Sequence, residues 1–131
     1  MKRVIVESWL RLIYVDLLLR FRNFNVVYQM VSRLPVRSTP AGSGLPYNEL
    51  CRAMDLACIF YFKRVLCLQR SAATTGLLRR HGWPAEMVIG VQMLPFRSHA
   101  WVEIDGTVVN DKTYVREMYS VFERYGSEVL P

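Results

Sequence analysis

Three residues in the second half of the chain have types suited to covalent chemistry. Cys67 opens the segment CLQRSAATTGLLRRH, which predicts a helix that stops at Gly82. His99 and Asp111 follow in the segment HAWVEIDGTVVND. A thiol becomes a strong nucleophile when the positive end of a helix dipole and a neighbouring imidazolium stabilise its thiolate. Cys67 is therefore a candidate nucleophile, although many cysteines at helix starts have no catalytic role.

Two histidines are available as a base for Cys67. His81 lies fourteen residues further along the same predicted helix, which places it roughly 21 Å away at about 1.5 Å per residue. That distance is too long for contact with the sulfur. If a histidine of the same chain activates Cys67, it is His99, and we interpret His81 as a cation at the helix end.

A catalytic imidazole also needs an acceptor that fixes its tautomer and stabilises its charged form. Glu103, Asn110 and Asp111 follow His99 and have suitable side chains. The register of a predicted hairpin selects among them, because Asp105 and Gly106 mark a turn between two strands.

The two possible registers give His99 different partners. A two-residue turn would pair His99 with Lys112 and put Asp111 on the opposite face. A three-residue loop of residues 104–106 would instead pair His99 with Asp111 on one face. We predict the three-residue loop and, with it, Asp111 as the orienting group. Glu103, on the same face but further along the strand from His99, is a weaker candidate.

The elements that must position these residues are predicted from periodicity and turn signals. Helices are expected at residues 4–22, 25–34, 49–64 and 67–81, with Asn48 capping the third. The buried stripe of the first helix is expected to comprise Leu10, Ile13, Tyr14, Leu17, Leu18 and Phe21. Cys51 and Cys58 are expected to pack in the core. A close neighbour would explain Gly76 inside the fourth helix.

The second half of the chain changes to strand patterns. Strands are expected at residues 87–94, 99–104 and 107–111, followed by a helix over residues 114–125 that Gly126 stops. These elements predict an α+β fold. We expect one compact domain with an N-terminal helical segment (1–34), a loop rich in proline and glycine (35–47) and a catalytic region (48–131).

Composition limits the possible classes of protein. The 131 residues are 52% hydrophobic, and the net charge is +6. The arginines are scattered, so we expect no nucleic-acid partner. Three cysteines form neither a disulfide framework nor a zinc pattern, which favours the reducing cytoplasm. Glu7, Arg11 and Asp16 interrupt the apolar start, which argues against a signal peptide and a membrane span. We expect no metal and no cofactor.

The segments CLQRSAATTGLLRRHGWPAEMVIGV and HAWVEIDGTVVND together resemble the cysteine peptidases that remove leader peptides during lasso-peptide maturation. These enzymes are a transglutaminase-like branch of the papain-type folds. The resemblance covers about half of the chain, from Cys67 to Asp111. It implies Cys67 as nucleophile, His99 as base and Asp111 as orienting group. Arg70 and Ser71 match the family motif, and we interpret them as packing or helix-start residues.

The resemblance also implies partners. The substrate would be the leader region of a precursor peptide, and an ATP-dependent lasso cyclase would take the released core. A small recognition domain grips the leader in this family, and the first 45 or so residues here lack the strands of such a domain. We therefore expect a separate leader-recognition protein.

Other functions are compatible with part of this pattern. A transglutaminase-like acyltransferase or deamidase would use the same three residues and the same acyl-enzyme, and only the acceptor would differ. A non-catalytic interaction module of the same fold would not need Cys67, His99 and Asp111. Gln69 is a possible oxyanion donor, but a solvated position in the first helical turn is the more common role.

Overall fold

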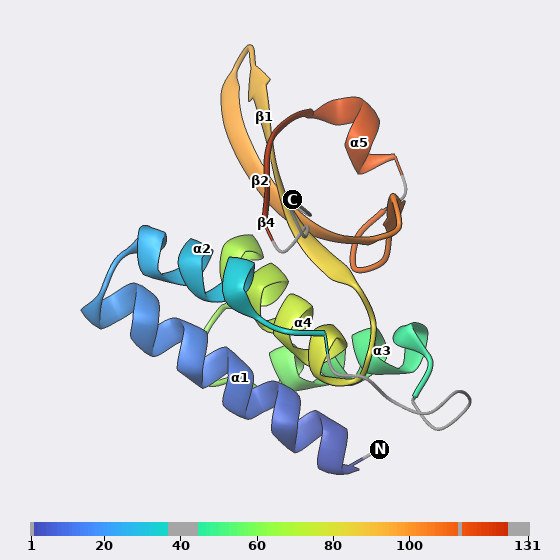
Figure 1. The fold of residues 1–131 in the computed structure, drawn as a ribbon. Helices are drawn as coiled ribbons and strands as arrows, with labels where there is room; N and C mark the ends of the chain where they lie inside the picture. Colours follow the sequence, from blue (N-terminus) through green and yellow to red (C-terminus); the bar gives the residue numbers. More distant parts are fainter. Residues whose placement is uncertain (1, 37–44, 113, 126–131) are drawn as a thin grey trace.

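The computed structural model describes residues 2–36, 45–112 and 114–125. Within these ranges the elements are, in order, α1 (Lys2–Phe21), α2 (Phe24–Arg33), α3 (Tyr47–Ile59), α4 (Cys67–Arg80), β1 (Ala85–Met93), β2 (Phe96–Ile104), β3 (Thr107–Val108), α5 (Val115–Met118) and β4 (Ser120–Tyr125). Figure 1 shows the first four helices gathered below a small sheet, with the β1–β2 hairpin extending away from them.

The sheet has the strand order β3-β2-β1-β4, and each neighbouring pair is antiparallel. Met87, Val102 and Ile104 on one face of the sheet belong to the main core, which they share with the helices. The other face carries a smaller cluster, made of Val88, Trp101, Val108 and Val115. Helices packed on an antiparallel sheet confirm the predicted α+β class.

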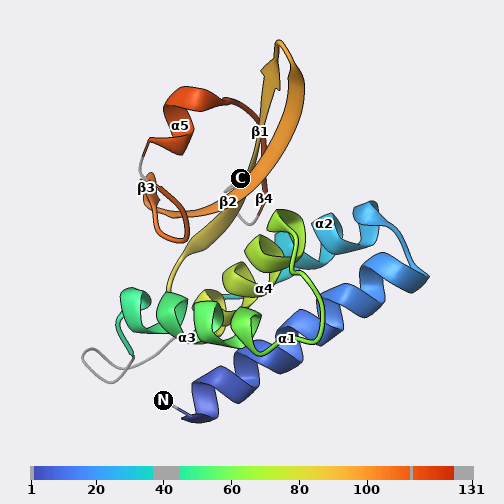
Figure 2. The same cartoon turned by 180° about the vertical axis from the view of Figure 1, so that it is seen from behind.

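Helix α4 occupies the centre of the molecule. It contacts α1, α2, α3, β1 and β2, and Figure 2 shows it between α1 and the sheet. Every residue from 71 to 79 is buried, and most of them are small. Small side chains let the neighbouring backbones approach closely. A Cβ atom on Gly76 would lie 2.7 Å from Nη1 of Arg11 in α1, which confirms that a close neighbour accounts for this glycine.

Helix α1 forms where it was predicted, but the expected buried stripe is wrong. Its buried residues are Val4, Ser8, Leu12 and Val15. Four members of the expected stripe are instead between 48% and 72% exposed, namely Leu10, Tyr14, Leu17 and Phe21. Apolar side chains surround this helix, so their spacing does not select one face. No helix in the described part of the chain is long and apolar enough to cross a membrane.

Two predicted features of α3 are also wrong. The helix begins at Tyr47 after Pro46, so Asn48 lies in the first turn and does not cap it. The helix ends at Ile59, before the predicted end at residue 64. Beyond it, the Tyr61 hydroxyl donates a 2.8 Å hydrogen bond to Asp16 of α1, and Lys63 pairs with the same carboxylate. These contacts hold the chain against α1 instead of continuing the helix.

The C-terminal segment forms a strand, contrary to the predicted helix over residues 114–125. Only α5 is helical there, and β4 then pairs with β1. Arg124 of β4 contacts Glu86 and Glu103 at 2.8 and 2.9 Å, and Tyr125 stacks on Tyr28 of α2. Pairing with the open edge of β1 thus outweighs the helical spacing. Gly126 and most of the predicted proline-rich loop lie outside the described residues.

Candidate active site

Cys67 is the first residue of α4, at the positive end of the helix dipole. Leu66 precedes it and makes no side-chain hydrogen bond to the first-turn amides. The interaction with the His99 side chain lowers the pKa of Cys67 against the opposing effect of burial. Backbone amides of Ala100 and Leu68 lower that pKa further. Cys67 is exposed, so its sulfur combines thiolate stabilisation with access for a substrate.

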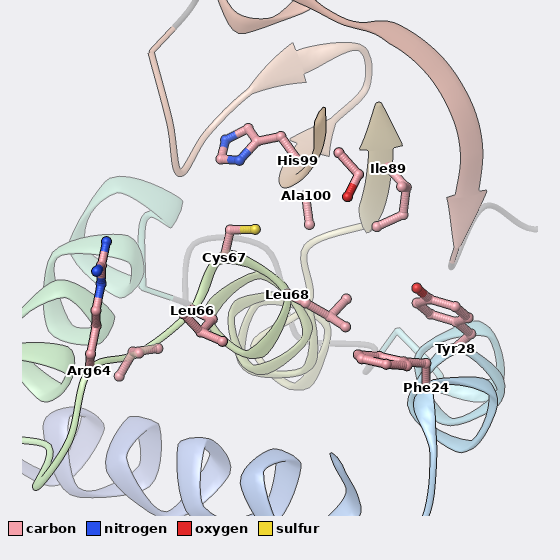
Figure 3. Close-up of a pocket in the computed structure, with 11 residues that line it drawn as sticks. Phe24, Tyr28, Arg64, Leu66, Cys67, Leu68, Ile89, His99 and Ala100 are labelled. Atoms are coloured by element: carbon pink, nitrogen blue, oxygen red, sulfur yellow. The ribbon is translucent and has the colours of Figure 1, made fainter. Parts of the chain in front are cut away.

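His99 lies on β2 with its ring between two polar partners. Its Nε2 atom is 2.5 Å from Oδ2 of Asp111. Nδ1 is thereby left to face Cys67, and Figure 3 shows the two side chains next to each other. The interaction with Cys67, followed by that with Asp111, raises the pKa of His99 to about 9, although burial opposes the shift. The ring also stacks on Tyr119 at 5.4 Å.

The structure brings His99 and Asp111 together, but the predicted hairpin register is wrong. Glu103 pairs with Val108 and Ile104 with Thr107, which leaves a two-residue turn. Asp105 and Gly106 both have positive φ, at 49° and 80°, as such a turn requires. Strand alternation in this register would put Asp111 on the face opposite His99, because residues at adjacent positions of a strand face opposite sides.

The contact forms because the chain leaves the sheet before Asp111. Strand β3 is only two residues long. Beyond it, the Asn110 side chain accepts a 2.7 Å hydrogen bond from the Val102 amide, in the place of a further strand residue. Asn110 also donates to the Ser71 hydroxyl at 3.4 Å. Strand alternation no longer applies after this point, so Asp111 is free to turn toward His99.

The other candidate residues lie outside this group. Glu103 is fully buried and accepts hydrogen bonds from Trp101 and Arg124, so it does not orient His99. His81 caps the C-terminal end of α4, as predicted, and its Nε2 lies 3.1 Å from Glu7.

Three residues near Cys67 have structural roles. Gln69 is buried and donates a 2.9 Å hydrogen bond to the Leu12 carbonyl of α1, so it is neither solvated nor an oxyanion donor. Arg70 pairs with Asp55 of α3. Ser71 is buried. Sequence reasoning missed the roles of Asn110 and Gln69, because each contacts a residue far away in the chain.

Two cavities flank Cys67 and His99. The larger, of about 620 Å³, extends from them toward α2. The smaller, of about 280 Å³, is more polar and includes Arg70, Ser71, Asn110 and Asp111. Within the described ranges, no group of three or more His, Cys, Asp or Glu side chains is arranged to hold a metal ion.

The remaining cysteines lie away from this site, on α3. Cys51 is buried and Cys58 half-buried. Burial raises the pKa of Cys51 to about 11 and also raises the pKa of Cys58. Both thiols are therefore protonated at neutral pH, whereas the pKa of Cys67 is shifted in the opposite direction.

Comparison with known proteins gives two matches. Over 55 residues the chain is 44% identical to the microcin J25-processing protein McjB of Escherichia coli, and this match covers 42% of the chain and 26% of McjB. The chain thus accounts for about a quarter of the length of that relative. No solved structure matches significantly. A family model described as the transglutaminase-like superfamily matches residues 11–124. Because this match spans most of the chain, including Cys67, His99 and Asp111, the protein belongs to the transglutaminase-like superfamily.

Proposed function

We propose that this protein is a cysteine peptidase that removes the leader from a lasso-peptide precursor. The main support is the arrangement of an exposed Cys67 at the start of α4 beside His99, whose Nε2 is held by Asp111. The similarity to McjB, a protein named for processing microcin J25, supports the class of substrate. In this proposal Cys67 is the nucleophile, His99 the acid and base, and Asp111 the orienting group.

The first half of the proposed reaction forms an acyl-enzyme. The Cys67 thiolate attacks the carbonyl carbon at the junction of leader and core, and the C–S bond forms as the carbonyl oxygen becomes an oxyanion. In this proposal the first-turn amides of α4 stabilise this charge. The C–N bond then breaks, and His99 gives its proton to the leaving amine of the core peptide.

The second half releases the leader. A water molecule attacks the thioester, and neutral His99 takes its proton. The C–S bond breaks, and the leader leaves with a new carboxylate. Asp111 accepts a hydrogen bond from Nε2 throughout, so that Nδ1 remains available for both proton transfers and the imidazolium is stabilised.

The proposed partners follow from this substrate. The peptidase would act on the leader region of the precursor, in cooperation with a separate leader-recognition protein. The released core would pass to an ATP-dependent cyclase, since hydrolysis of the leader exposes the amine needed for ring closure. We propose that these steps take place in the cytoplasm, where the three free cysteines remain reduced.

Mass spectrometry of the reaction products tests this function. A panel of lasso-peptide precursors, including that of microcin J25, is incubated with the protein in water enriched in oxygen-18. Hydrolysis should give two fragments, and one heavy oxygen should appear in the new carboxylate of the leader. Cys67→Ala should abolish cleavage, whereas Cys58→Ala should retain it.

The same experiment identifies the competing acyltransferase or deamidase, which would use the same residues. Deamidation would leave the chain of the precursor intact and exchange one amide for a carboxylate. Transfer would attach an added amine, such as putrescine, to the acyl group. Either product, without leader removal, would replace the peptidase proposal. Unchanged cleavage by Cys67→Ala would exclude Cys67 as the nucleophile.

A further inference from the structure

The larger cavity beside Cys67 is bordered mainly by apolar side chains from three elements. Phe24 and Tyr28 come from α2, Leu68 from the first turn of α4 and Ile89 from β1. Figure 3 shows these side chains grouped on the side of Cys67 that faces α2. The volume of about 620 Å³ is large enough for a bulky side chain together with some peptide backbone.

In this aromatic wall the Tyr28 ring is held by stacking, and Phe24 stands at the start of a capped helix. The Tyr28 ring stacks on Tyr125 of β4, with 4.6 Å between centroids and 11° between planes. Phe24 is the first residue of α2, and the side chain of Asn23 caps this helix through a 3.1 Å hydrogen bond from the Val26 amide. Phe24 is nevertheless 59% exposed, so a ligand can still cover its ring. An aromatic surface held in place but open to solvent favours an apolar occupant.

The direction of the peptide is inferred from the proton transfer by His99 and from the polarity of the two cavities. The leaving amine must lie against His99, because that residue supplies its proton. His99 borders both cavities, and the smaller, more polar one, which also includes the Asp111 carboxylate, suits the amine of the leaving part better than the apolar one. The acyl part then lies on the opposite side of Cys67, over Leu68 and toward α2.

We propose that the cavity next to α2 binds a large apolar side chain within two residues of the scissile bond, on its acyl side. Phe24 and Tyr28 determine this specificity. The inference rests on the proposed peptidase function, in which the acyl part is the end of the leader. Apart from His99, Arg64 is the one cationic side chain among the residues that line this cavity. If Arg64 governed the site instead, an acidic side chain would bind best.

Peptide chloromethyl ketones test this specificity without a known substrate. Cys67 displaces chloride to form a C–S bond, and the thiol proton passes through His99 to solvent. The probes are acetyl-Phe-Gly, acetyl-Gly-Phe, acetyl-Gly-Glu, acetyl-Glu-Gly and acetyl-Gly-Gly chloromethyl ketones. Iodoacetamide reports the intrinsic reactivity of Cys67. At least one phenylalanine probe should label Cys67 ten or more times faster than the Gly-Gly probe, and both glutamate probes should be slower than that phenylalanine probe.

Variants of the wall identify the residues responsible. Phe24→Ala and Tyr28→Ala should each reduce the preference for phenylalanine at least threefold, while iodoacetamide labels Cys67 within twofold of wild type. Phe21→Ala is the matched control, because Phe21 is equally apolar and 72% exposed but does not line the cavity. Circular dichroism checks folding. Phe24 is exposed, so Phe24→Glu should leave the core intact and gives a second test. In this variant the preference for phenylalanine should change to a preference for lysine at the same position of the probe.

Each contrary result has its own meaning. Rapid iodoacetamide labelling with equal rates for the phenylalanine and Gly-Gly probes would overturn the specificity and leave the peptidase proposal standing. A preference for glutamate would also overturn it in favour of Arg64. Slow labelling of Cys67 by iodoacetamide would overturn both proposals, because the thiolate itself would be absent.

Discussion

At the scale of single residues, Cys67 and His99 stabilise each other's charged forms. The pKa of His99 is raised to about 9, first by Cys67 and then by Asp111. The pKa of Cys67 is lowered, first by His99. The thiolate and the imidazolium therefore coexist from below the ordinary thiol pKa up to about pH 9. Above that value His99 loses its proton, which the proposed mechanism requires for the leaving amine.

The first prediction concerns thiol reactivity. At pH 7, iodoacetamide should alkylate Cys67 about a hundredfold faster than Cys51 or Cys58, because the pKa values of the latter two are raised by burial. Peptide mapping by mass spectrometry over a time course measures the three rates. His99→Ala should slow only the reaction of Cys67. Equal labelling of all three cysteines in folded protein would contradict the assignment.

The second prediction concerns the orienting role of Asp111. Its carboxylate helps to raise the pKa of His99, so Asp111→Asn should lower that pKa. The alkaline limb of the pH profile of kcat/KM should then move to lower pH. The acid limb should move up, because the imidazolium that lowers the pKa of Cys67 is less stable. We expect kcat/KM at pH 8 to fall by at least about tenfold.

Asp105→Asn is the matched control for this change. Asp105 is exposed in the hairpin turn with φ of 49°, a conformation that asparagine adopts readily. This variant should keep both limbs of the wild-type profile. Identical profiles for Asp105→Asn and Asp111→Asn would show that Asp111 does not act through His99.

The sequence predicted the contact between His99 and Asp111, although by an incorrect route. The rise per residue of a helix was enough to exclude His81 as the base for Cys67. This rule depends only on local geometry, which the sequence predicts well. Choosing Asp111 relied on strand alternation beyond Val108, where the strand has already ended. The side chain of Asn110 ends the ladder by taking the Val102 amide, and no periodic pattern signals such a bond. The catalytic roles of the three residues stay predictions.

At the scale of elements, the packing of the aromatic side chains around His99 depends on one glycine. Gly90 of β1 pairs with His99 of β2. A Cβ atom there would lie 2.5 Å from the Trp101 ring and 2.7 Å from Cβ of Tyr119. These two aromatic residues are the ring neighbours of His99. The absence of a side chain at Gly90 thus lets them pack directly over β1 and support the imidazole.

The third prediction compares two glycine-to-alanine changes. Gly90→Ala must displace the ring of Trp101 or the backbone of Tyr119, so it should destabilise the fold by about 1–3 kcal/mol and slow the labelling of Cys67. Gly76→Ala meets only the flexible end of Arg11 at such short range, and it gains up to about 1 kcal/mol of helix propensity. It should be near neutral. Thermal unfolding measures both variants, and equal losses of stability would contradict this difference in packing.

The elements themselves were predictable where the local pattern was decisive. Helices α2 and α4 and strands β1 and β2 lie close to their expected positions. The strand β4 was not predictable, since Tyr114, Met118 and Tyr125 have helical spacing and the segment becomes a strand only by pairing with β1. The buried face of α1 was ambiguous for a related reason. Its apolar residues surround the helix, and only the neighbouring helices decide which side is covered.

At the scale of the whole molecule, the site lies where the two layers meet. Cys67 belongs to the helical layer, whereas His99 and Asp111 belong to the sheet and its following loop. Gln69 ties the start of α4 to α1, and Asn110 reaches from the sheet to Ser71 of α4. The distance between Cys67 and His99 is thus set by long-range packing and not by one local motif.

The last prediction concerns how this molecule captures its substrate. The cavity beside Cys67 holds only a few peptide residues, and ordering each one costs about 1–2 kcal/mol of backbone entropy. The isolated chain should therefore cleave a full-length precursor slowly at micromolar concentrations. A leader-recognition protein that holds the leader near the site would raise its local concentration to about the millimolar range.

Adding that recognition protein should accelerate cleavage at least about tenfold at micromolar concentrations. Initial rates with and without it, followed by mass spectrometry, measure the effect. A precursor that lacks the recognised part of the leader but keeps the cleavage site is the control, and its cleavage should not accelerate. Full-rate cleavage by the isolated chain, unchanged by the added protein, would contradict the need for a partner. The chemistry proposed for Cys67 would stand in that case, because the short segment around the scissile bond would then supply enough binding by itself.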